Sequence, residues 1–137
     1  MSADKIDKAG LIKYRLEQAR DTLRDAYSLH KNEGTPVSIV NRAYYAMFYA
    51  ALAVLITIDR GSSKHKGVIA VFDEQFVKQN IFPKETSKML HQAFELRQEG
   101  DYRDASKITV EKAVKTLKSA EEFITLVEEK LKGYYEK

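Results

Sequence analysis

Residues 97–104 of the sequence, RQEGDYRD, hold a guanidinium, a carboxylate and a phenol within a few positions of one another, on Arg97, Asp101 and Tyr102. A guanidinium can bind a phosphate through two parallel charge-assisted hydrogen bonds, so Arg97 is a candidate phosphate ligand. The structural alternative is an Arg97–Asp101 ion pair that closes a turn at a helix end, which contributes little stability when it is exposed. The sequence alone leaves both interpretations open.

A second set of polar side chains shares one face of an otherwise apolar helical stretch. Residues at positions i, i+3, i+4 and i+7 lie on the same side of a helix, and these positions hold Ser38, Asn41, Arg42 and Tyr45. A guanidinium at the edge of a buried helix needs a carboxylate, a phosphate or water, so we expect this face to bind a ligand. The alternative is that the tyrosines here only bury their rings and bond their hydroxyls to nearby carbonyls.

The third candidate is the basic segment SKHKG at residues 63–67. It stands near the start of a predicted short helix, where free backbone N–H groups attract anions. Lys64 and His65 are therefore candidate phosphate ligands, and a solvated loop is the alternative.

The sequence lacks the residue patterns of metal sites, phosphate-binding loops and nucleotidyltransferases. The histidines His30, His65 and His91 have no metal-ligand spacing and no neighbouring acidic cluster, and the chain has no cysteine. Gly61-Ser62 is not followed by the Gly-Lys-Ser/Thr of a phosphate-binding loop, nor by the paired aspartates with which a nucleotidyltransferase holds magnesium. We expect no metal and no cofactor, and a chain that is not itself such a transferase.

Length and composition limit the class of protein. The 137 residues suffice for one domain, residues 1–137, with a single core. A formal net charge of +3 is too small to indicate nucleic-acid binding by itself. Without cysteine, and with an N-terminus (MSADKIDKAG) that lacks the apolar core of a signal peptide, the sequence predicts a cytoplasmic location.

The candidate residues depend on a central helix predicted over residues 35–60. Thr35 can cap it and Pro36 suits its first position. Residues 43–56 include no charged or strongly polar side chain, so we expect this helix to be covered on every side. A membrane span is the alternative, but the run is shorter than about 20 residues and begins directly after Asn41-Arg42.

Apolar residues at three- and four-residue steps predict the surrounding helices. One covers residues 4–31, a short one covers 65–79, one runs from Pro83 to about Arg97 and stops at Gly100, and one capped by Thr109 runs to about Tyr134. No segment alternates with the two-residue period of a strand. The prediction is all-α: an up-and-down antiparallel four-helix bundle with one additional short helix.

Three segments of the chain are informative in this order and spacing: SIVNRAYYAMF (38–48), SKHKG (63–67) and RQEGDY (97–102). Together they resemble the HEPN family, the "higher eukaryotes and prokaryotes nucleotide-binding" domain. The resemblance covers essentially the whole chain and is to the small stand-alone prokaryotic branch. It implies an up-and-down four-helix bundle, often a homodimer. Prokaryotic members commonly pair with minimal nucleotidyltransferases in toxin–antitoxin systems, and many are metal-independent ribonucleases.

The ribonucleases of this family carry an R-x(4-6)-H motif, in which the arginine steadies phosphate and the histidine assists attack by the RNA 2'-hydroxyl. Arg97 matches the arginine, but Tyr102 stands where a four-residue spacing would place the histidine, and His91 precedes the arginine. A phenol, with an ordinary pKa of about 10, is a poor general base at neutral pH. The resemblance thus implies phosphate binding by Arg97 and Arg42 more directly than catalysis.

Three hypotheses follow. The first is a homodimeric module that binds nucleotide or RNA phosphate and acts with a nucleotidyltransferase partner, away from any membrane. The second is a metal-independent ribonuclease toxin, with Arg97, Asp101 and Tyr102 catalytic or His65 in place of the motif histidine. The third is a purely structural helical protein.

Two expectations concern variants. Arg97→Ala should weaken phosphate binding and leave the melting temperature nearly unchanged, because an arginine at a helix end contributes little to a core. A charge at Ala46 or Leu52 should unfold the chain.

Overall fold

The computed structural model describes residues 3–62 and 64–136, so Ser63 of the basic segment lies outside the described residues. This part of the chain contains five α-helices and no strand, which confirms the predicted all-α bundle with one short helix. The helices are α1 (Ala3–Lys31), α2 (Pro36–Ile56), α3 (His65–Phe72), α4 (Lys84–Tyr102) and α5 (Val110–Tyr135). A π-helical segment, Asp73–Val77, continues α3, and a 3-10 turn, Ala105–Lys107, precedes α5.

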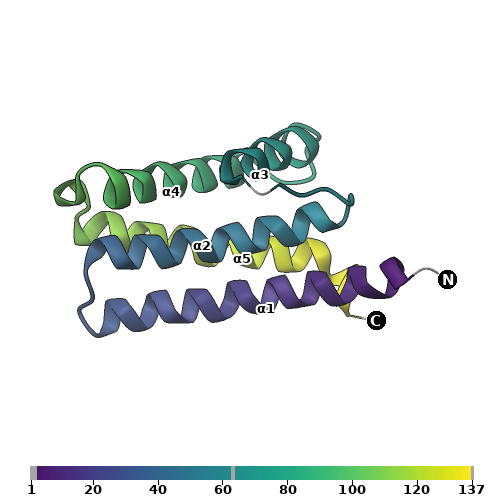
Figure 1. Ribbon diagram of the computed structural model, residues 1–137, viewed down its shortest axis with the longest axis horizontal. Helices are drawn as coiled ribbons and strands as arrows, with labels where there is room; N and C mark the ends of the chain where they lie inside the picture. The colour runs from purple at the N-terminus through teal and green to yellow at the C-terminus, as the bar shows by residue number, and fades with distance from the viewer. Residues whose placement is uncertain (1–2, 63, 137) are drawn as a thin grey trace.

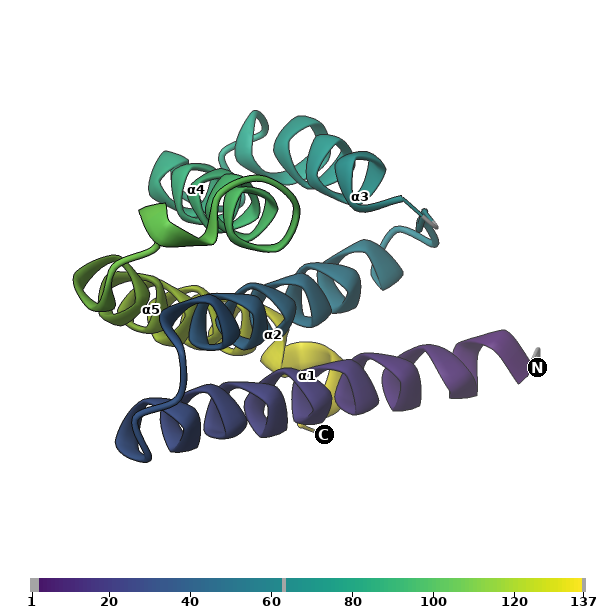
Figure 2. The ribbon, with the colours of Figure 1, turned by 60° about the vertical axis from the view of Figure 1, so that its left-hand side comes forward.

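Helix α2 lies at the centre of the bundle, between α1 on one side and the α3–α4 layer on the other, with α5 beside it (Figures 1 and 2). Its start is as predicted: Thr35 accepts a hydrogen bond from the Ser38 amide at 3.2 Å, and Pro36 is the first helical residue. By length and composition alone α2 could cross a membrane, but 67% of its most apolar stretch is buried within the bundle. It serves as the core helix.

One expectation about α2 is wrong, because the helix is not covered on every side. Tyr45, Tyr49, Leu52 and Ile56 are only partly buried, and at steps of three and four residues they share one face. We call these four residues the α2 stripe. It continues directly from the polar face that holds Arg42.

Helix α4 does not end at Gly100 but continues to Tyr102, so the segment expected to be a turn is the last part of a helix. Gly100 instead permits close packing. A Cβ atom there would lie 3.2 Å from the Cγ1 atom of Ile108 and 3.3 Å from that of Val37, tighter than most such contacts. A glycine at this position therefore lets the end of α4 approach the start of α2.

The last helix has the start that the sequence predicts, since Thr109 accepts a hydrogen bond from the Lys112 amide at 3.1 Å. A partly buried network also joins α5 to α1. Arg20 donates two hydrogen bonds to Glu128, at 2.9 and 2.6 Å, one to Thr125 at 3.0 Å and another to Glu121. These contacts fix α1 against α5 on the side of the bundle away from α4 (Figure 1).

The burial of α2 predicts different outcomes for two charge substitutions. Ala46 is fully buried, so Ala46→Asp should lower the free energy of unfolding by about 3 kcal/mol or more, because an unpaired carboxylate would be buried. Leu52 lies on the partly open α2 stripe, so Leu52→Asp should remain folded, contrary to the expectation from sequence. Urea denaturation of both variants measures the difference. Equal loss of stability would show that the stripe is closed.

Candidate phosphate-binding site

The carboxylate of Asp101 joins α4 to α2. Its Oδ2 atom accepts a hydrogen bond from Arg97 Nε at 3.1 Å and another from Asn41 Nδ2 at 2.9 Å. Arg97 and Asp101 are four residues apart on one helix, and their side chains are only 11% and 21% exposed. The Arg97–Asp101 ion pair is therefore present, but within helix α4 rather than in a turn. The same carboxylate also bonds to α2 through Asn41.

Arg97 lies among aromatic rings. Its Nη2 atom donates to the hydroxyls of Tyr45 and Tyr102, at 3.0 and 3.1 Å, and its guanidinium carbon lies 5.3 and 5.1 Å from the centres of those two rings. Within the described residues, Nη1 has only a 3.5 Å contact with Gln98. One edge of the guanidinium is thus fixed, while the N–H groups of Nη1 retain capacity for a stronger acceptor.

Arg42 enters the same network from α2. Its Nε and Nη2 atoms donate to Asn41 Oδ1 at 3.1 and 2.9 Å, and its guanidinium carbon lies 5.1 Å from the centre of the Tyr45 ring. Tyr45 therefore contacts both arginines. Two guanidinium groups meet in a network that includes one carboxylate, Asp101, so a bound phosphate would relieve their repulsion.

His65, the first residue of α3, stacks on Phe48 with ring centres 4.2 Å apart and planes inclined by 14°. Its Nδ1 atom is 2.7 Å from the hydroxyl of Tyr44, which is fully buried. Burial raises the pKa of Tyr44 far above its ordinary value, so this hydroxyl keeps its proton. Among the described residues, Nδ1 of His65 is the acceptor that lies within reach of this hydroxyl, so Tyr44 donates to Nδ1 and the neutral ring carries its own proton on Nε2.

The protonation state of His65 follows from its surroundings. Burial lowers the pKa of the imidazole, and the positive charge of Arg97 lowers it further. His65 is therefore neutral at physiological pH and offers an N–H donor at Nε2.

An open hollow of about 650 Å³ lies beside Arg97 and His65, whereas Arg42 borders a separate depression. Of the described residues that line it, none carries a carboxylate. Tyr102 is 68% exposed at its edge and presents a ring face on which a base could stack. The lining residues are Lys64, His65, Lys66, Phe94, Arg97, Gln98, Tyr102 and Arg103.

Most of the residues selected from the sequence meet at this place. Asn41, Arg42, Tyr45, Arg97, Asp101 and Tyr102 form one bonded network, and Lys64 and His65 line the hollow beside it. Ser38 does not reach the hollow. Its hydroxyl accepts a hydrogen bond from Thr35 at 2.8 Å, and it lines a separate depression with Asn41, Arg42 and Asp101.

Sequence reasoning missed several residues of the site. Tyr44 and Phe48 are four positions apart on α2, a spacing that could have indicated a shared partner for their rings. Lys66 and Arg103 each lie close in sequence to a selected residue. Among the described residues, no three histidine, aspartate or glutamate side chains gather as metal ligands would.

The lowered pKa of His65 predicts a pH-dependent contribution to stability. Its contribution is fully present above the unfolded pKa of about 6.5 and is lost as the pH falls through the lower folded pKa. His65→Gln should therefore show a smaller fall in melting temperature between pH 7.5 and 5 than the unaltered protein. His30→Gln is the control, because His30 is exposed in the last turn of α1, away from the hollow. Equal pH profiles for all three proteins would contradict the assignment.

Comparison with known proteins gives the family. The model of the HEPN domain matches residues 12–130. A UPF0332 protein of Thermotoga maritima is 38% identical over 122 residues, which cover 89% of this chain and 92% of the relative. Two proteins of Methanocaldococcus jannaschii have toxin in their names. "Putative toxin MJ0605" is 32% identical, covering 88% of this chain and 89% of the relative, and "Putative toxin MJ0142" is 33% identical, covering 72% and 66%. The protein therefore belongs to the HEPN family.

Proposed function

We propose that this protein is a single-domain, cytoplasmic homodimer that binds nucleotide or RNA phosphate and acts with a minimal nucleotidyltransferase in a toxin–antitoxin-type pair. The observation that carries the phosphate site is a hollow lined by Lys64, Lys66, Arg97 and Arg103 with no carboxylate in its described lining. The toxin names of the two relatives support the toxin-like role.

The groups around the hollow have complementary tasks in such a site. The Nη1 edge of Arg97 has spare donors, and the Nε2–H of His65 supplies a neutral donor beside it. Lys64 and Lys66 flank the start of α3, where backbone N–H groups add to the positive potential. The exposed ring of Tyr102 offers stacking area for a base.

A second function, a metal-independent ribonuclease, rests on one observation: a neutral imidazole, that of His65, lines the same hollow as Arg97. A general base must be unprotonated at the nitrogen that meets the substrate. The hydrogen bond from Tyr44 occupies Nδ1 and leaves the proton on Nε2, which makes His65 a better donor than base. Binding without cleavage is therefore the function that this geometry favours.

Arg97→Ala is not the best test of the site. Its side chain is 11% exposed and joins α2 to α4 through Tyr45 and Asp101, so we now expect Arg97→Ala to lower the melting temperature as well as phosphate binding. Arg97→Lys retains the charge and part of the packing but loses the planar fork.

The phosphate site predicts weaker binding of a short single-stranded RNA in two variants. Arg97→Lys should lower the affinity by about tenfold or more, because the Nη1 donors that the planar guanidinium holds in place are lost. Lys64→Ala, a change at an exposed residue, should lower it less and reduce its salt dependence. Lys130→Ala, on the exposed face of α5, is the matched control. Fluorescence anisotropy at two salt concentrations measures these effects.

Cleavage of the same RNA in the presence of a chelator separates the three hypotheses. Binding without cleavage supports the module. If the unaltered protein cleaves the RNA and both Arg97→Lys and His65→Gln abolish the cleavage, the ribonuclease hypothesis replaces the binding module. If the protein neither binds nor cleaves the RNA, only the hypothesis of a structural helical protein remains.

The proposed homodimer would use the α2 stripe, because Tyr45, Tyr49, Leu52 and Ile56 leave apolar surface open beside the site. Leu52→Asp should keep the fold and shift the protein to monomers, since the charge would be buried between two copies. Sedimentation velocity at micromolar concentrations measures this. A monomeric unaltered protein would rule out the dimer, and Lys130→Asp is the control.

A further inference from the structure

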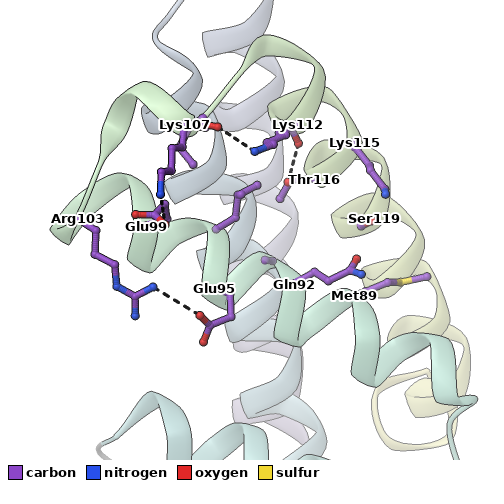
Figure 3. Close-up of a pocket in the computed structure, with 13 residues that line it drawn as sticks. Met89, Gln92, Glu95, Glu99, Arg103, Lys107, Lys112, Lys115, Thr116 and Ser119 are labelled. Atoms are coloured by element: carbon purple, nitrogen blue, oxygen red, sulfur yellow. Dashed lines mark hydrogen bonds and ion pairs between the residues drawn. The ribbon is translucent and has the colours of Figure 1, made fainter.

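A second concavity, a groove of about 400 Å³, lies between α4 and α5 (Figure 3). Its apolar part consists of Ala93 and Ile108, which are buried, and Met89 and Leu96, which are partly buried. The polar residues on its borders are Gln92, Glu95, Glu99, Arg103, Lys107, Lys112, Lys115, Thr116 and Ser119. The groove shares only Arg103 with the lining of the candidate phosphate site.

The charges on the borders are unequal. On the α4 side, Glu95 lies 3.8 Å from Arg103 and Glu99 lies 3.9 Å from Lys107, so each carboxylate already has a cation (Figure 3). On the α5 side, Lys112 donates to the Lys107 carbonyl at 3.0 Å. Within the described part of the chain, no carboxylate lies within ion-pair distance of Lys112 or Lys115. The α5 border therefore presents two exposed positive charges, on Lys112 and Lys115, that are available to an acidic partner.

The shape of the groove suits a helix better than a nucleic acid. The α4 residues of the lining run from Met89 to Glu99, which at about 1.5 Å per residue is roughly 15 Å, or about three helical turns. An amphipathic helix can place apolar side chains at i, i+3/i+4 and i+7 on such a floor. A phosphate backbone would instead meet Glu95 and Glu99 and leave the apolar floor uncovered.

We propose that the groove between α4 and α5 docks an acidic amphipathic helix of a partner protein. The helix buries its apolar face on Met89, Ala93 and Leu96, and its carboxylates pair with Lys112 and Lys115. This docking site is separate from the proposed phosphate site, and different residues supply its binding contacts. Because Arg103 borders both, the bound helix lies next to the end of α4 that holds Arg97.

A fluorescence assay tests the groove directly, because the chain has no cysteine and a single one can be labelled cleanly. Gln92→Cys, at an exposed position of the lining, carries an environment-sensitive dye, and Lys130→Cys on α5 carries the same dye as a control. The probe is a 16-residue helical peptide of leucine and glutamate with leucines at i, i+3, i+7 and i+11. A peptide of the same composition in scrambled order and a leucine–lysine peptide are the comparisons.

We expect saturable binding of the acidic amphipathic peptide at the Gln92→Cys dye alone, and binding about tenfold weaker or less for both comparison peptides. The double change Lys112→Glu and Lys115→Glu should weaken binding by about tenfold or more, whereas Lys130→Glu should not. Arg97→Lys should leave peptide binding unchanged, which separates failure of the groove from failure of the phosphate site. Circular dichroism confirms that each variant is folded.

Three results would overturn the proposal. The first is no peptide binding, or equal binding by the double variant. The second is self-association that disappears in the double variant, because the groove would then hold a second copy of this chain. The third is an RNA oligonucleotide that displaces the peptide from the labelled groove.

Discussion

The contact on which the site depends is the hydrogen bonding of Asp101 to both Arg97 and Asn41. It ties the last turn of α4 to the first turns of α2. A nearly buried guanidinium needs a partner for its charge, and Asp101 is a carboxylate one helical turn away on the same face. Because the bond to Asn41 comes from another helix, pairing the charge also sets the distance between the helices. The close approach at Gly100 makes that distance sterically available.

The aromatic residues of α2 perform two tasks at once. Tyr44 lies wholly within the core and Tyr45 only partly, yet each hydroxyl ends at a polar group of the site, His65 or Arg97. A tyrosine can be inserted into a core in this way because its ring supplies apolar area while its hydroxyl keeps a partner. The same rings hold the cation and the imidazole in fixed orientations, so the candidate site is organised without a ligand.

The bundle leaves two surfaces incompletely covered, and they differ in character. The α2 stripe is apolar and lies beside the candidate site, and it is the surface of the proposed dimer. The groove between α4 and α5 has an apolar floor with positive charge along the α5 side. Both exist because four helices cannot surround a central helix and one another completely, so some faces stay open.

The sequence by itself determined the helices and singled out most of the residues that the structure brings together at the candidate site. Apolar residues at steps of three and four specify a helix through local geometry alone, and Thr35, Pro36 and Thr109 mark starts that the structure reproduces. The polar face with Asn41, Arg42 and Tyr45 stood out for the same reason, since one helical turn brings such residues together. Arg97, Asp101 and Tyr102 stood out because they are close in sequence.

Only the tertiary structure decided which of these groups meet and what state they are in. The end of α4 was misplaced because Gly100 is unfavourable in a helix by local propensity, whereas packing against Val37 and Ile108 favours it there. Leu52 could not be recognised as partly open, because the openness of one face depends on where the other helices lie. His65 and Tyr44 are 21 residues apart, and their contact, which sets the proton position on the imidazole, arises only when α3 folds back onto α2.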